Sequence, residues 1–215
     1  MCSLCSYDIL RAYMNTLYPS ERLFFAINTA TQLHRNQIRK DKEQTPYISH
    51  LFSVMTLLSS VTSDEDVLIA GLLHDVLEDV AEYSKEKLQK DFGERVYTYV
   101  SFVTEELDPH KEMGDQVPWL TRKENYIQKL RLAKAESMLI SLADKIHNLS
   151  SIKYALETGD TELFSKFNGS FANQLFFYEA IISIGEKHLG DGHPFVIRIK
   201  SLVQEITVLT TRDQK

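Results

Sequence analysis

Residues 68–80, LIAGLLHDVLEDV, decide how this chain folds. On a helical wheel of 100° per residue, His74, Asp75, Glu78 and Asp79 share one arc of about 140°. The leucines and valines take the other side, as in a helix that buries one face. The segment is too apolar for a surface helix, so we expect His74 and Asp75 to lie near the core. Carboxylates placed there must be paired or bound to a cation.

The same helical pattern continues on both sides of this segment, and strand-like alternation is scarce. The spacing predicts one helix over residues 21–40, a second that starts at Pro46, and a third that runs from Ser63 through the whole of LIAGLLHDVLEDV. Thr121 and Glu124 have the spacing of a capping box that opens a later helix. The predicted fold class is therefore all-α.

The chain has 215 residues, of which 43% are hydrophobic and 25% charged, which is the composition of an ordinary globular protein. This length fits one domain. We expect residues 1–19 to form an N-terminal extension and residues 20–215 to form a single compact helical bundle. Its C-terminal helices are expected over residues 160–210, after the glycine at position 159.

Charge and targeting signals limit the partners. The chain carries 24 Lys and Arg against 30 Asp and Glu, a net charge of −6. This balance argues against broad binding to nucleic acid polymers or anionic membranes, so a phosphate-bearing ligand would need a local basic patch. The start of the chain lacks the apolar run of a signal peptide, and we expect a cytoplasmic location. Cys2 and Cys5 are interpreted as two reduced thiols near the terminus.

Two further segments place polar residues in apolar surroundings. The run SMLISLADKIHNL puts Asp144 and Asn148 one turn apart, and TPYISH ends in His50. Together with His74 and Asp75, these segments offer two imidazoles and two carboxylates, a set that suits Mn²⁺, Fe²⁺, Co²⁺ or Zn²⁺. The absence of cysteine ligands argues against a structural zinc site. Each signal is weak alone, since a buried histidine is more often a packing residue.

Other polar residues are given structural interpretations. His34 is expected to be a packing or surface residue. His147 falls at about 300° from Asp144 on the wheel and is expected to point away from that face. Residues 107–118, with two prolines and a glycine, are expected to form a flexible loop. Whether this loop closes over a substrate stays open.

The order of the segments RKDKEQTPYISH, LLHDVLEDV, FGERVYTYVSFVTEE and LADKIHNL resembles the HD-domain hydrolases of the RelA/SpoT type, most closely the stand-alone small alarmone hydrolases. The resemblance covers about residues 25–152, which hold the core motifs. It implies one bound Mn²⁺ and three groups of site residues: metal ligands (His50, His74, Asp75 and Asp144), catalytic acids (Glu78 and Asp79), and substrate-binding residues (Arg39, Lys40 and Asn148).

The reaction that the resemblance implies removes the 3′-diphosphate from guanosine tetra- or pentaphosphate (ppGpp or pppGpp), giving GDP or GTP and pyrophosphate. Two carboxylates and two neutral imidazoles leave a divalent ion with no net charge, so it should acidify water less than a site with three neutral ligands. A nearby base is then useful, and Glu78 and Asp79 each lie about one turn from a ligand. Arg39, against the purine, and Lys40 would offset ligand charge.

Three residues depart from the family pattern. Leu51 follows His50 where the family usually has proline, Trp119 stands where a basic residue is expected, and Phe176 stands where the small hydrolases have tyrosine. Two alternatives therefore remain: an HD-type phosphohydrolase that acts on another nucleotide or phosphate ester, and a non-catalytic nucleotide sensor. The presence of both Glu78 and Asp79 disfavours the sensor. The oligomeric state is left open.

Overall fold

The computed structural model describes residues 20–105, 117–159 and 171–212. The predicted N-terminal extension with its two cysteines, and most of the predicted loop 107–118, lie outside these residues. The described chain is helical apart from turns and an isolated antiparallel bridge between Ile38 and Pro46, so the all-α prediction is confirmed. The helices are α2 (Glu21–Leu33), α3 (Ile48–Ser59), α4 (Glu65–Leu72), α5 (Val76–Asp79), α6 (Lys85–Phe92), α7 (Glu94–Val103), α8 (Trp119–Leu132), α9 (Ala135–Glu157), α11 (Phe171–Leu189) and α12 (Pro194–Arg212).

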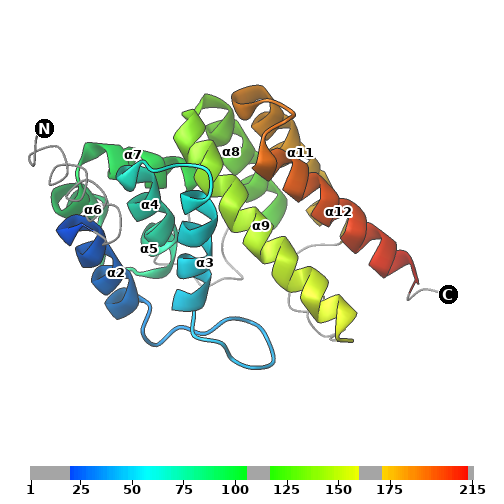
Figure 1. Cartoon of the computed structure of the whole chain (residues 1–215), viewed down its shortest axis with the longest axis horizontal. Coiled ribbons are helices and arrows are strands. Elements are labelled where there is room, and N and C mark those ends of the chain that lie inside the picture. The colour runs from blue at the N-terminus through cyan, green and yellow to red at the C-terminus, as the bar shows by residue number, and fades with distance from the viewer. Residues whose placement is uncertain (1–19, 106–116, 160–170, 213–215) are drawn as a thin grey trace, which may run out of the picture.

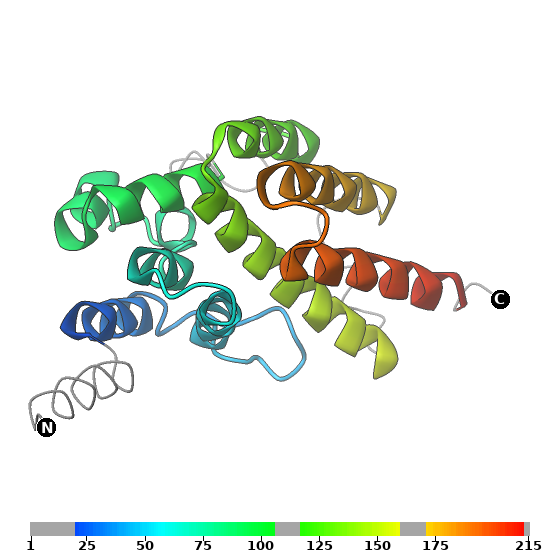
Figure 2. The same ribbon diagram turned by 45° about the horizontal axis from the view of Figure 1, so that its top comes forward.

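Helix α9 organises the bundle. It runs diagonally through the middle of the molecule, with α3, α4 and α7 packed on one side and α11 and α12 on the other (Figure 1). Helix α4 lies inside the first group and contacts α2, α3, α7 and α9. Figure 2 shows α8 and α11 side by side above α9, where α8 also contacts α7. Among the described residues, no helix combines the length and the apolar character needed to cross a lipid bilayer.

Local sequence sets several helix starts. Ser20 and Ser84 cap α2 and α6 by accepting a backbone N–H with their hydroxyl oxygens, and Asp64 does the same for α4 with its carboxylate. The predicted capping box at residues 121–124 is wrong, because α8 already begins at Trp119, directly after Pro118. Pro118 has no backbone N–H that needs a partner, and its ring fixes φ. It therefore fits directly before the first residue of the helix.

The first predicted helix is shorter than expected. It ends at Leu33, and residues 34–47 form a loop that doubles back on itself. The bridge between Ile38 and Pro46 closes this loop, and its tip contains Gln44 at φ 53°. After the loop, α3 begins at Ile48, two residues beyond Pro46.

The third predicted helix is broken at the segment that decides the fold. Helix α4 ends at Leu72, a turn follows, and α5 begins at Val76. The His74 ring explains the break: its Nδ1 bonds to the Gly71 carbonyl at 2.9 Å, taking the acceptor that a continuous helix would offer to the N–H of Asp75. The wheel angles therefore do not apply across the turn, and His74 and Asp75 are placed by the turn instead.

Close packing of α3 on α4 gives a test of the fold. A Cβ added at Gly71 would lie 2.3 Å from Cδ1 of the fully buried Leu58. Overpacking of this kind costs about 1–3 kcal/mol, whereas replacing a helical glycine by alanine gains at most about 1 kcal/mol. We expect Gly71→Ala to lower the free energy of unfolding by about 1–2 kcal/mol, measured by urea denaturation.

Gly185→Ala is the matched control for this prediction. Its added Cβ meets Leu142 Cδ1 at 3.3 Å and Val196 Cγ2 at 3.4 Å, both much longer than the contact at Gly71. We expect the stability of this variant to stay within about 0.5 kcal/mol of the native value. A Gly71→Ala protein as stable as the native chain would show that α3 and α4 are not packed this closely.

Candidate functional site

Four side chains from three parts of the chain meet between α3, α9 and the turn that separates α4 from α5. The Nε2 atoms of His50 and His74 are 3.3 Å apart. Asp75 Oδ2 lies 3.1 Å from His74 Nε2, and Asp144 Oδ1 lies 3.3 Å from His50 Nε2. The structure thus brings together the four predicted metal ligands, His50, His74, Asp75 and Asp144.

The spacing and chemistry of these atoms fit one divalent ion. Ligand atoms about 2.1 Å from a common ion and at right angles to each other lie about 3.0 Å apart, close to the distances found here. Ligand atoms of His50, His74 and Asp75 all lie within 4.8 Å of one another. Burial alone would lower the pKa of His74, but the charges of Asp75 and Asp144 raise this pKa well above its ordinary value. The cluster therefore favours a positive charge, which a cation can supply.

Hydrogen bonds behind the two imidazoles fix which nitrogen faces the cluster. His74 donates from Nδ1 to the Gly71 carbonyl, so Nε2 is the nitrogen that faces the cluster. The Nδ1 atom of His50 lies 2.8 Å from Nδ1 of His147. Burial, followed by the electrostatic effects of His50 and Arg39, lowers the pKa of His147 to about 4. A neutral His147 can accept the proton of His50 Nδ1, so the Nε2 of His50 is also left free for a metal.

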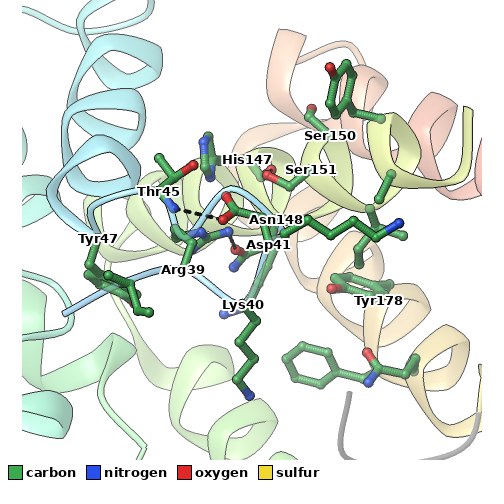
Figure 3. A pocket seen from close by; sticks show the side chains of 18 of the residues that line it. Arg39, Lys40, Asp41, Thr45, Tyr47, His147, Asn148, Ser150, Ser151 and Tyr178 are labelled. Atoms are coloured by element: carbon green, nitrogen blue, oxygen red, sulfur yellow. Dashed lines mark hydrogen bonds between the residues drawn. The ribbon is translucent and has the colours of Figure 1, made fainter. Parts of the chain in front are cut away.

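His147 does not point away from Asp144, so that prediction is wrong. A wheel angle of 300° is only 60° from Asp144 on the other side, and residues three apart share a helix face. The side chain of His147 accordingly lines the same side of α9 as Asp144 and Asn148, as Figure 3 shows for His147 and Asn148. His34 is buried and stacks on Tyr47, in agreement with a packing role.

Two residues that were not predicted from the sequence donate hydrogen bonds to the carboxylates of Asp75 and Asp144. Tyr47 donates its hydroxyl to Asp75 Oδ2 at 2.5 Å. Lys145 donates to Asp144 Oδ2 at 2.5 Å, and Asn148 donates to the other oxygen at 2.6 Å. Against the effect of burial, Lys145 holds the pKa of Asp144 well below its usual range. A signal for Lys145 was available, because it is a charged residue in the middle of an apolar helix.

Two further carboxylates stand beside the cluster on α5. Glu78 accepts the backbone N–H of Glu105. Burial and then the negative charge of Asp75 raise the pKa of Glu78 to about 8, and the same two causes raise the pKa of Asp79 to about 6. Crowded acids of this kind share protons in the absence of a cation. They are therefore poised to hold or release a proton next to the ligand cluster.

A cavity of about 1000 Å³ opens beside the cluster, between the loop 34–47, α9 and α11. Figure 3 shows Arg39 of the loop beside Asn148 of α9, while the side chain of Lys40 extends away from Asn148. The Arg39 guanidinium donates to Asn148 Oδ1 at 3.0 Å and lies 5.7 Å from the Tyr47 ring centroid. All three predicted substrate-binding residues therefore line one cavity, which also contains Glu78.

The cavity is more basic than the chain as a whole. Six Lys and Arg residues line it against four Asp and Glu, whereas acidic residues outnumber basic ones in the full sequence. This is the local basic patch that a phosphate-bearing ligand requires. Its cations are Arg39, Lys40, Lys42, Arg122, Lys123 and Lys145.

The aromatic residues of α11 that line the cavity are not the one expected from the sequence. Phe176 is 53% exposed and does not line the cavity, whereas the buried Phe177 and Tyr178 do. The sequence alone did not fix the register of α11, because three aromatic residues stand in a row. Trp119, which stands where a basic residue was expected, lies in the same wall with Phe177 at 6.4 Å between ring centroids.

Comparison with known proteins agrees with this arrangement. A Drosophila melanogaster protein named guanosine-3′,5′-bis(diphosphate) 3′-pyrophosphohydrolase MESH1 is 37% identical over 147 residues, 67% of this chain and 77% of the fly protein. A Borreliella burgdorferi guanosine-3′,5′-bis(diphosphate) 3′-pyrophosphohydrolase is 34% identical over 140 residues, 64% of this chain, which spans only 20% of that longer protein.

A solved structure and a family model extend the comparison. The structure, described as a metazoan ortholog of SpoT that hydrolyzes ppGpp and plays a role in starvation responses, superposes with a TM-score of 0.67 at 28% identity, covering 87% of this chain and 97% of that one. The family model described as HD domain matches residues 26–172, well over half of the chain. The chain therefore belongs to the HD domain family.

Proposed function

We propose that this chain is a metal-dependent hydrolase that removes the 3′-diphosphate from ppGpp or pppGpp, giving GDP or GTP and pyrophosphate. The observation that carries the proposal is the convergence of two imidazoles and two carboxylates beside a basic cavity. The names of the fly and Borreliella relatives point to the same substrate. A small nucleotide as ligand and a cytoplasmic location are part of the proposal.

The ion that we propose for the cluster is Mn²⁺, with Fe²⁺, Co²⁺ or Zn²⁺ as alternatives. Imidazole and carboxylate donors are compatible with all four, so the choice rests on the family resemblance. His50, His74, Asp75 and Asp144 would hold it. When bound, a divalent ion polarises a phosphoryl oxygen and lowers the pKa of water.

Glu78 and Asp79 are the proposed acid–base pair. The oxygen of a water molecule attacks the phosphorus attached to the ribose 3′ oxygen, and the bond from that phosphorus to the 3′ oxygen breaks. One of the two carboxylates takes the proton of the attacking water, and the other, in its protonated form, gives a proton to the departing 3′ oxygen. Glu78 is the better placed of the two because it lines the cavity itself.

Arg39, Lys40 and Asn148 are proposed to bind the nucleotide. The hydrogen bond between Arg39 and Asn148 links the loop 34–47 to α9 and holds the guanidinium over the cavity. A planar guanidinium can stack on a purine, while Lys40 supplies a charge for phosphate.

The first test is substrate choice. We expect the purified chain with Mn²⁺ to convert ppGpp to GDP and pyrophosphate, and to act far more slowly on GTP, GDP and other nucleotides without a 3′-diphosphate, as measured by chromatography of the products. Preferred turnover of a substrate without that group would support another phosphohydrolase. Tight binding without any product would support a sensor.

The second test concerns Glu78. We expect Glu78→Gln to lower kcat at least 100-fold, because general acid–base groups contribute about 10²–10⁴-fold, while the bound metal is retained. Glu82→Gln, on an exposed turn outside the cavity, is the matched control and should keep native kcat. Equal kcat for Glu78→Gln and the native chain would remove Glu78 from the mechanism.

The third test concerns His147. We expect His147→Ala to weaken Mn²⁺ binding about 10–100-fold, the usual effect of losing a group that orients a histidine ligand. His147→Asn, whose side-chain oxygen can replace Nδ1 as an acceptor, should recover most of the affinity. Calorimetric titration with Mn²⁺ measures both, and unchanged affinity in His147→Ala would show that the contact with His50 is only packing.

A further inference from the structure

Glu105 occupies a position in the cavity that the proposed reaction does not use. It follows the end of α7, and its carboxylate forms an ion pair with Lys123 of α8. Its other oxygen lies 4.0 Å from Nε of Arg122. Glu105, Arg122 and Lys123 all line the same cavity as Glu78, so this ion-pair cluster faces the space that the nucleotide would fill.

The two cations are held in place by their surroundings. Lys123 Nζ lies 4.9 Å from the Phe177 ring centroid and 5.7 Å from that of Trp119, and burial lowers its pKa. The Nε of Arg122 is buried and makes no hydrogen bond with any residue in the described ranges. Glu105 therefore does not satisfy the Nε donor of Arg122. This N–H can donate a hydrogen bond to a second acceptor.

The main chain around Glu105 is fixed separately from its side chain. Lys129 of α8 donates to the carbonyl of Thr104 at 2.8 Å, and the Glu105 N–H donates to the Glu78 carboxylate. The Glu105 carboxylate can therefore leave the cations by rotating its side chain, while the backbone contact with Glu78 persists.

We propose that Glu105 is a built-in competitor for the ligand: its carboxylate occupies the Arg122–Lys123 pair until a phosphate group of the substrate displaces it. The inference rests on the proposed function, since it assigns one subsite of that same cavity. A phosphate carries more charge and more acceptor oxygens than a carboxylate, so it can satisfy both the ammonium of Lys123 and the free Nε of Arg122. Glu105 thereby lowers the affinity for every anion that must use the pair.

The test is direct binding of inorganic pyrophosphate to the full chain loaded with one equivalent of Mn²⁺, measured by calorimetry. We expect Glu105→Gln to bind pyrophosphate about five- to tenfold more tightly than the native chain, because a charged competitor is removed. The gain should shrink at high salt. Glu105→Gln combined with Lys123→Gln should lose the gain, since the cation that it freed is gone.

Glu43→Gln is the matched control. Glu43 lines the same cavity from the exposed loop 34–47, so its substitution changes the charge of the cavity equally. We expect less than a twofold change in its affinity for pyrophosphate. An equal gain in Glu43→Gln, or no gain in a Glu105→Gln protein whose thermal unfolding midpoint is native, would overturn the proposal.

The outcome separates this inference from the proposed function. A chain that fails to hydrolyse ppGpp but gains pyrophosphate affinity through Glu105→Gln supports the competitor and contradicts the hydrolase. A chain that hydrolyses ppGpp but shows no gain contradicts only the competitor.

Discussion

The structure depends on keeping two carboxylates and two imidazoles together inside an apolar bundle. Asp144 is buried, and isolated carboxylates in such a place are strongly unfavourable. Each acid is therefore held by a hydrogen-bond donor outside the cluster, Tyr47 for Asp75 and Lys145 for Asp144. With the imidazoles turned by Gly71 and His147, four electron-pair donors point at one place. A divalent cation there would satisfy all four donors at once.

The elements around the cluster follow from this requirement. The break between α4 and α5 lets neighbouring residues His74 and Asp75 face the same point, which a straight helix would not allow. The long α9 supplies Asp144 to the cluster, and one turn later it supplies Asn148 to the cavity. The cluster and one wall of the cavity are therefore built on one helix, and their relative position is set by helix geometry.

Much of the fold could be predicted from the sequence because periodicity reports which face of a helix is buried. The all-α class follows from that pattern, and the selection of His50, His74, Asp75 and Asp144 follows from polar residues in apolar surroundings. The break after Leu72 could not be predicted in this way, because it depends on a hydrogen bond from the His74 ring. Arg39 and Lys40 lie on a loop without helical periodicity. They were identified from the family resemblance and not from residue spacing.

The contacts that support the site were harder to find. Tyr47 and Glu105 act through partners that are distant in sequence, and no local pattern marks such pairs. Lys145 pairs with its neighbour Asp144, and only its charge within an apolar helix marks it. The most direct test of the account is the anomalous scattering of a crystal of the native chain grown with Mn²⁺. The account predicts one strong peak within coordination distance of His50, His74, Asp75 and Asp144. A peak elsewhere, or no peak at full Mn²⁺ loading, would contradict it.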